Sequence, residues 1–231
     1  TWLHITGITP AISRNACEVT KSAVMAAKEA NLTISCDLNF RGKLWGWDKN
    51  YSPKELAQKE MPEILKFVDI IIGNEQDADD VLGINIKGSD FDKGVIEISQ
   101  YSEIAKMVAE RFSNLSYIAI TLRESISANH NRWGAMLYDC KDDASYFSPQ
   151  KDGEYSAYEI TDIVDRLGAG DSFAAALIFS LHDSKLSPKD ALNFSVAASC
   201  IAHSIKGDFN ITTADEVKKL ADGFTSGRVV R

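Results

Sequence analysis

Short runs of β-branched and other apolar residues alternate along the chain with longer segments whose apolar residues recur at helical spacing. The run VDIIIG at residues 68–73 is nearly continuously apolar, as in a strand buried on both faces of a parallel sheet. This pattern predicts strands at residues 2–6, 33–38, 68–73, 116–122 and 134–139, and helices at residues 12–31, 75–82, 100–112, 171–182, 188–205 and about 213–222.

Alternation of strands and helices over the whole length predicts an α/β sandwich with a mostly parallel sheet, formed by residues 1–231 as a single domain. Two segments, residues 40–60 and 123–133, are predicted to be long irregular connections. Ligands of such sheets bind beyond the carboxyl ends of the strands. We therefore expect the functional residues directly after strands.

The composition excludes several classes of function. The formal net charge of −8 disfavours nonspecific binding to nucleic acid or to an anionic membrane. No signal peptide and no long apolar span is recognisable, and the four cysteines are scattered without metal or redox spacing. These features predict a cytoplasmic protein with free thiols and a small-molecule ligand.

The segment DRLGAGDSF, at residues 165–173, carries the strongest chemical signal. If a helix starts at Asp171, the N–H groups of Gly168, Ala169, Gly170 and Asp171 lack partners within the helix and, with the positive helix end, form an anion site. Asp171 would then lie beside a bound phosphate and could accept a proton from an attacking hydroxyl. A plain glycine turn with Asp171 as a helix N-cap explains these residues equally well.

The same segment resembles the C-terminal signature of the ribokinase-like, or PfkB, family of carbohydrate kinases, D-T-x-G-A-G-D-x-F. The resemblance implies a three-layer α/β/α sandwich in which the main chain of residues 168–170 forms an anion hole for the transferred phosphoryl group. It also implies that Asp171 is the catalytic base and contacts the sugar. Arg166 stands where the family has threonine.

A second segment, CDLNFRGKLW at residues 36–45, follows a predicted strand. Asp37, Asn39 and Arg41 alternate, so an extended chain places their side chains on one side. The segment is similar to the 2-keto-3-deoxygluconate kinase branch of the family. That resemblance implies that Arg41 lies near a sugar acid and that Asn39 lies near the nucleotide; a surface loop is the alternative.

Polar residues also follow the strand at 68–73, in the sequence GNEQD. Asn74, Glu75 and Asp77 could order the water around Mg²⁺, although acids at a helix N-terminus are common without a metal. The family has N-x-x-E here, which implies that Asn74 contacts the nucleotide and that Glu75 and Asp77 belong to the metal site.

Other matches to the nucleotide site are weaker. Thr121 and Arg123 lie at the end of the strand predicted at 116–122, where the family has T-L-G-x-x-G. Gly207 matches a family glycine after a helix rich in small residues. The small side chains of that helix suit a flat adenine, although core packing explains them equally well. The resemblance implies ATP and Mg²⁺ as cofactors; a monovalent cation and a homodimer stay open.

The resemblance starts partway through the family's sequence, because its G-D-x-x-N substrate motif and β lid have no counterpart here. We therefore expect this sequence to be a C-terminal portion, without the N-terminal part and lid. The predicted function is ATP-dependent phosphorylation of an acid sugar, most simply 2-keto-3-deoxygluconate. The alternatives are a fructokinase or ribokinase, a catalytically inactive nucleotide- or sugar-binding regulator, and a dehydrogenase, which the missing G-x-G-x-x-G fingerprint disfavours.

Overall fold

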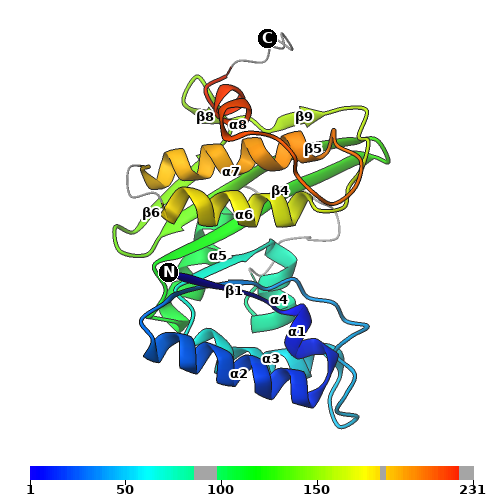
Figure 1. Cartoon of the computed structure of the whole chain (residues 1–231), viewed down its shortest axis with the longest axis vertical. Helices are drawn as coiled ribbons and strands as arrows, with labels where there is room; N and C mark the ends of the chain where they lie inside the picture. The colour runs from blue at the N-terminus through cyan, green and yellow to red at the C-terminus, as the bar shows by residue number, and fades with distance from the viewer. Residues whose placement is uncertain (86–97, 183–185, 224–231) are drawn as a thin grey trace. The chain divides into compact units, whose positions relative to one another are not determined.

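The structure, a computed structural model, describes residues 1–85, 98–182 and 186–223 (Figure 1). The chain divides into two compact units. Unit 1 comprises residues 1–121 and 136–145, and unit 2 comprises residues 122–135 and 146–231. The expectation that the whole chain forms one domain stays a prediction.

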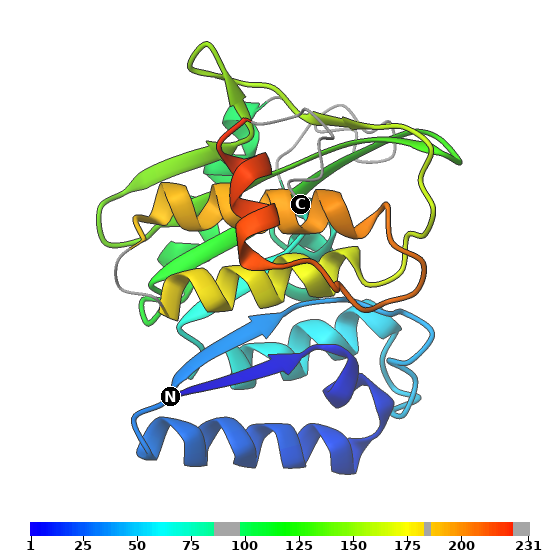
Figure 2. The same cartoon turned by 45° about the horizontal axis from the view of Figure 1, so that its top comes forward.

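Unit 1 is built on parallel strands joined by helices, as the hydrophobic pattern predicts. Strand β1 pairs with β2, β2 with β3 and β3 with the start of β4, all in parallel. Helix α2 packs against β1 and β2, as Figure 2 shows. The elements that lie in this unit or begin in it are β1 (Trp2–Thr6), α1 (Ile8–Ile12), α2 (Arg14–Glu29), β2 (Thr33–Asp37), α3 (Pro53–Leu65), β3 (Ile70–Gly73), α4 (Glu75–Leu82), α5 (Ile98–Arg111) and β4 (Tyr117–Ser127).

Unit 2 combines antiparallel strands with three packed helices. Strand β5 pairs with β9 and β7 with β8, both antiparallel, while α7 packs against both α6 and α8 (Figure 1). The order of hydrogen-bonded strands is β1-β2-β3-β4-β5-β6, and β9 also pairs with β5. The remaining elements are β5 (His130–Asp139), β6 (Ala144–Ser148), β7 (Gln150–Lys151), β8 (Glu154–Tyr155), β9 (Tyr158–Ile160), α6 (Ala169–His182), α7 (Pro188–Ala202) and α8 (Ala214–Ala221).

Of the two predicted irregular connections, the one at residues 40–60 is confirmed only as far as Ser52, and the one at residues 123–133 is wrong. Helix α3 begins inside residues 40–60, because Ser52 and Glu55 form a capping box and Pro53 occupies the first turn. Residues 123–133 are mostly strand, since β4 continues to Ser127 and β5 already begins at His130. Both regions are therefore more regular than their polar composition indicated.

The predicted helix at 12–31 is interrupted near its start. Ser13 is extended and accepts a hydrogen bond from the N–H of Ala16 at 3.1 Å, so it caps α2 and separates it from α1. Helix α6 begins at Ala169, two residues earlier than predicted. Asp171 is consequently the third residue of α6 rather than its first.

Candidate nucleotide and phosphate site

The glycine turn of unit 2 presents unpaired main-chain donors. The N–H of Ser172 donates to the carbonyl oxygen of Gly168 at 2.7 Å, which is the first hydrogen bond of α6. Among the described residues, the N–H groups of Ala169, Gly170 and Asp171 have no acceptor. Three free donors at the positive end of a 14-residue helix form a site suited to an anion.

The two glycines of this turn have different structural roles. Gly168 has a φ of +75°, and a Cβ atom there would lie 2.3 Å from the carbonyl oxygen of Asp208. The turn therefore requires glycine at 168 for both its conformation and its close packing. A Cβ atom on Gly170 would meet nothing within 4 Å, so the space beside its N–H is open.

Asp171 is exposed and forms no hydrogen bond or ion pair with any described residue. Its carboxylate lies on the first turn of α6, next to the free donors of residues 169–171. An accessible carboxylate beside an anion site is the arrangement that a general base for a hydroxyl acceptor requires. The geometry is compatible with the role predicted for Asp171. The alternative that Asp171 is a helix N-cap is not supported, because its side chain accepts no hydrogen bond from a described main-chain N–H.

An open groove of about 220 Å³ runs along α6 from Ser172. Its apolar walls include Phe179 and Phe194, whose ring centroids lie 5.8 Å apart, and Ala198 of α7. On its polar side, Asn210 donates to the hydroxyl of Ser172 at 2.7 Å and to the carbonyl of Ala198 at 3.0 Å. Its lining is Ser172, Ala175, Ala176, Phe179, Phe194, Ala198, Asn210, Thr212, Ala214 and Val217.

The small residues of α7 serve mainly to pack this helix against α6. Ala197 is buried, and the buried Ser199 donates its hydroxyl to the carbonyl oxygen of Ala169 at 2.7 Å. Ala198 is the member of this stretch that also lines the groove. Core packing is therefore the main reason for the composition of this helix.

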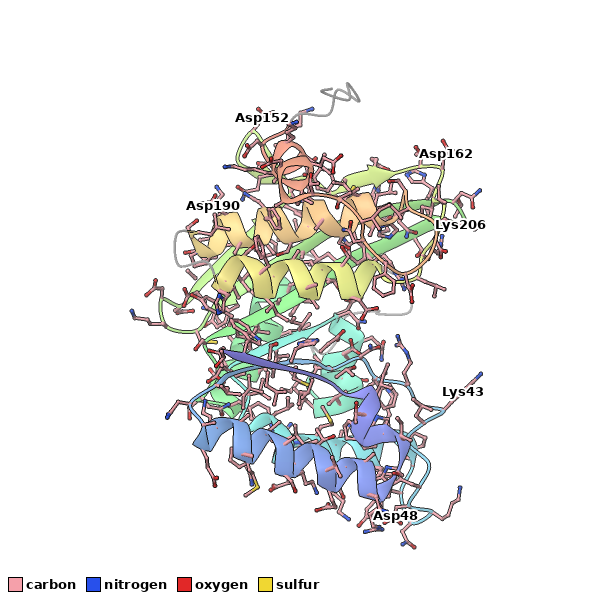
Figure 3. All side chains as sticks on the ribbon, viewed as in Figure 1. Lys43, Asp48, Asp152, Asp162, Asp190 and Lys206 are labelled. Carbon is pink, nitrogen blue, oxygen red and sulfur yellow. The ribbon has the colours of Figure 1, made fainter. Side chains whose placement is uncertain are left out.

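The predicted nucleotide residues Gly207 and Arg123 also lie in unit 2. The N–H of Gly207 donates to Asp165 Oδ2 at 3.0 Å, so it is already paired. Figure 3 shows Lys206, the residue before Gly207, at the same end of unit 2 as Asp162. Asp162 lies on the segment that leads to the glycine turn. Arg123 is exposed on β4. Its contact with a nucleotide stays a prediction.

The other predicted site residues gather at the carboxyl ends of the parallel strands of unit 1. Thr121 follows β4's pairing with β3, and its hydroxyl donates to the carbonyl of Gly73 at 3.4 Å. Asn39 has a φ of +36° in the segment after β2, and Arg41 is exposed two residues further on. The strand register thus brings Thr121 beside the end of β3 that leads into Asn74.

Asp77 connects two of these segments. Its Oδ1 accepts the N–H of Phe40 at 2.9 Å, and its Oδ2 accepts the N–H of Asn74 at 3.0 Å. The side chain of Asn74 accepts the N–H of Asp77 in return, which completes a capping box. Asp77 is only 6% exposed, and burial raises the pKa of its carboxyl despite the two N–H donors.

Both carboxylate oxygens of Asp77 thus accept backbone N–H groups and hold the local structure, which leaves little of the carboxylate accessible to a metal ion. The other two predicted residues are Asn74, the exposed N-cap of α4, and Glu75, the half-buried first residue of this helix. Oxygen atoms of this kind fit a Mg²⁺ ion that keeps most of its water, because Mg²⁺ gives up hydration reluctantly. The assignment of Glu75 and Asp77 to a metal site stays a prediction.

Sequence reasoning missed two elements of the site. Asp165 and Arg166 hold the glycine turn through contacts described below, and Asn210 anchors the groove. Asp165 was visible as part of the family signature, and Arg166 as a departure from it. The sequence did not mark Asn210 as part of the groove, because the partners of its side-chain N–H₂ group, Ala198 and Ser172, lie 12 and 38 residues away.

Comparison with known proteins agrees with this geometry. Residues 136–213 match the family model described as the pfkB family of carbohydrate kinases. The chain is 39% identical to the 2-dehydro-3-deoxygluconokinase of Thermotoga maritima, with a TM-score of 0.82 over 96% of this chain and 60% of that protein. It is 27% identical to a PfkB family carbohydrate kinase of Listeria grayi, with a TM-score of 0.77 over 95% of this chain and 59% of that one.

A curated relative is the 2-dehydro-3-deoxygalactonokinase of Haloferax volcanii, 25% identical over 97% of this chain and 58% of that protein. The chain is thus a relative of the pfkB carbohydrate kinases and has the ribokinase-like α/β fold, a mostly parallel sheet with helices on both sides, which confirms the predicted resemblance and fold. It spans about three fifths of the length of these relatives. No helix among the described residues is long and apolar enough to cross a membrane.

Proposed function

We propose that the protein transfers the γ-phosphoryl group of ATP to a hydroxyl of an acid sugar of the 2-keto-3-deoxygluconate class. The observation that carries this proposal is the first turn of α6, where three unpaired N–H groups adjoin the exposed carboxylate of Asp171. Phosphoryl transfer needs chiefly positioning and stabilisation of charge, and this turn supplies both.

In this proposal Asp171 accepts the proton of the attacking hydroxyl, and the N–H groups of residues 169–171 stabilise the negative charge on the transferred group. Mg²⁺ would neutralise charge on the phosphates when it is bound with ATP. Asn74 and Glu75 would hold it through its water, and Asp77 fixes the backbone at Phe40 and Asn74.

The groove along α6 suits the base of the nucleotide. It begins at Ser172, directly after Asp171, and its aromatic and alanine walls offer flat apolar surface. Arg41 supports an acid substrate, because its exposed guanidinium has the planar geometry that binds a carboxylate. The relatives of Thermotoga maritima and Haloferax volcanii are named as kinases of such sugars, which supports the same choice.

The test is ADP release by the protein at its full natural length, with ATP and Mg²⁺. We expect turnover with 2-keto-3-deoxygluconate or its galactonate epimer, and much lower kcat/KM with the neutral sugars fructose and ribose. The sugar-free reaction is the control. Binding of ATP without turnover on any sugar would favour a nucleotide-binding regulator, and preference for a neutral sugar would contradict the role of Arg41.

A further inference from the structure

Arg166 ties the glycine turn to a distant part of unit 2. Its Nη2 donates to the carbonyl oxygens of Ser127 and Ala128 at 2.7 and 2.5 Å, and it lies 3.5 Å from Asn131 Oδ1. Ser127 is the last residue of β4, Ala128 lies in the β4–β5 turn and Asn131 is the second residue of β5, and all three precede Arg166 by 35 to 39 residues. The side chain of Arg166 therefore fixes the distance between this turn and the residues that lead into α6.

Asp165 also binds this segment, through hydrogen bonds to its carboxylate. Its Oδ1 accepts the N–H of Arg166 at 2.7 Å and that of Leu167 at 3.0 Å, while its Oδ2 accepts the N–H of Gly207 at 3.0 Å. Hydrogen bonds from Leu167 and Gly207 lower the pKa of the Asp165 carboxyl, which keeps it charged. The turn is thus bound both to the β4–β5 connection and to the segment after α7.

The donors of Arg166 that have partners point at carbonyl oxygens of the protein, not at the anion site. The site's own donors, the N–H groups of residues 169–171, stay unpaired. Gly168 lies between the two groups and packs so closely on Asp208 that a Cβ atom would not fit. A displacement of Arg166 would therefore move the backbone that carries the free donors.

We propose that Arg166, together with Asp165, is a positioning residue that holds residues 165–168 so that the donors at 169–171 and the Asp171 carboxylate keep their geometry. This inference rests on the proposed kinase function. The family's threonine is too short to reach the β4–β5 turn, whereas a guanidinium can bind several carbonyl oxygens from one position. Because Ser127 and Ala128 are exposed, water can replace Arg166 there, so its removal should affect position more than stability.

The first test compares Arg166→Ala with Arg132→Ala. Arg132 is an exposed arginine on β5 that pairs with Glu124 and Glu159 and does not touch the glycine turn. We expect Arg166→Ala to lower kcat about 10- to 100-fold, because small misplacement of a reacting group has effects of that size, with KM for ATP changed less than about 3-fold. Arg132→Ala should leave both constants unchanged.

Two additions separate positioning from other roles. Millimolar guanidinium should restore part of the turnover of Arg166→Ala, since Arg166 is exposed to solvent. Arg166→Lys should have lower turnover than the wild type, because an ammonium group lacks the planar set of N–H donors of a guanidinium. If instead the dissociation constant for ATP rises while kcat is kept, Arg166 contacts the phosphates directly and the proposal is overturned.

Hydrogen exchange provides a readout that needs no activity. The amides of Arg166 and Leu167 are hydrogen-bonded to Asp165, so their exchange should become at least about 10-fold faster in Arg166→Ala and stay unchanged in Arg132→Ala. Unchanged exchange would refute the positioning role even in an active enzyme. Faster exchange in a protein without any kinase activity would support the positioning of the turn while refuting the proposed function.

Discussion

Asp77 of unit 1 and Asp171 of unit 2 occupy the same place in their helices, since each is the third residue. Asp77 is 6% exposed and both its oxygens accept backbone N–H groups, whereas Asp171 is exposed and has no partner among the described residues. The residue before each helix accounts for part of this contrast. Asn74 has a side chain that completes a capping box, and Gly168 has none.

The comparison teaches that an acid in the first turn of a helix is not by itself a functional residue. At the start of α4 the N–H groups of Asn74 and Asp77 are satisfied by the side chains of Asp77 and Asn74, which stabilises the fold. In α6 the donors are left open, which stabilises nothing in the free protein but provides a place for a negatively charged ligand. Four experiments test this contrast, from the largest expected effect to the smallest.

The substitution Asp171→Asn should lower kcat by about 10²- to 10⁴-fold, the range for loss of a general base, while nucleotide affinity is nearly kept. The free energy of unfolding should change by less than about 0.5 kcal/mol, because the carboxylate is exposed and unpaired. Steady-state kinetics and urea denaturation measure the two effects. Normal turnover in this variant would remove Asp171 from the mechanism.

The glycines on either side of Ala169 should differ when each is replaced by alanine. Gly168→Ala should destabilise the protein by about 1–3 kcal/mol, since φ is +75° and the Cβ atom would meet the carbonyl of Asp208. Gly170→Ala should leave stability unchanged or raise it by up to about 1 kcal/mol. Its methyl group enters the open space beside the donors, so it should weaken nucleotide binding, measured by calorimetry.

For Asp77, we expect stability rather than chemistry to change first. Asp77→Asn places an amide N–H₂ against one of two backbone N–H groups, which should cost about 1–3 kcal/mol of unfolding free energy. The control is Asp215→Asn, an exposed acid in the first turn of α8. A variant that unfolds like the wild type but requires far more Mg²⁺ would show that Asp77 binds the metal directly.

The smallest effect concerns His203, which binds the segment that precedes the glycine turn. Its carbonyl accepts the N–H of Val164 at 2.9 Å, and its buried ring donates through Nδ1 to the carbonyl of Ser199 at 2.8 Å. Burial lowers the pKa of His203, so the folded state favours the neutral ring. Its contribution to stability is therefore present above the ordinary pKa of 6.5 and is lost as the pH falls through the lowered value.

Urea denaturation at about pH 7.5 and about pH 5.5 should show this loss, and His203→Gln should reduce the difference between the two. His130→Gln serves as the control, because this histidine is less buried and its ring pairs with Glu159. An equal pH dependence in wild type and His203→Gln would contradict the assignment.

Much of the fold was readable from local patterns. The run of isoleucines in β3, the helices α4 and α8 and the start of β1 all lie within a residue or two of the predicted bounds, since periodicity and capping residues act over a few positions. Helix α3 was missed although Ser52, Pro53 and Glu55 give a local signal for its start. Strands β6 to β9 were not predicted, and three of the four have only two or three residues.

By itself, the sequence determined the glycine turn, the acid that follows it and the family resemblance, because these depend on residue types at fixed short spacing. Only the tertiary structure decided which acids are free. The partners of Asp77 and of Arg166 lie up to 39 residues away, and the fold brings them within hydrogen-bond distance. The sequence shows that a residue carries a carboxylate or a guanidinium but not what lies beside it in space. The neighbours that folding brings to the group decide whether it binds the protein or a ligand.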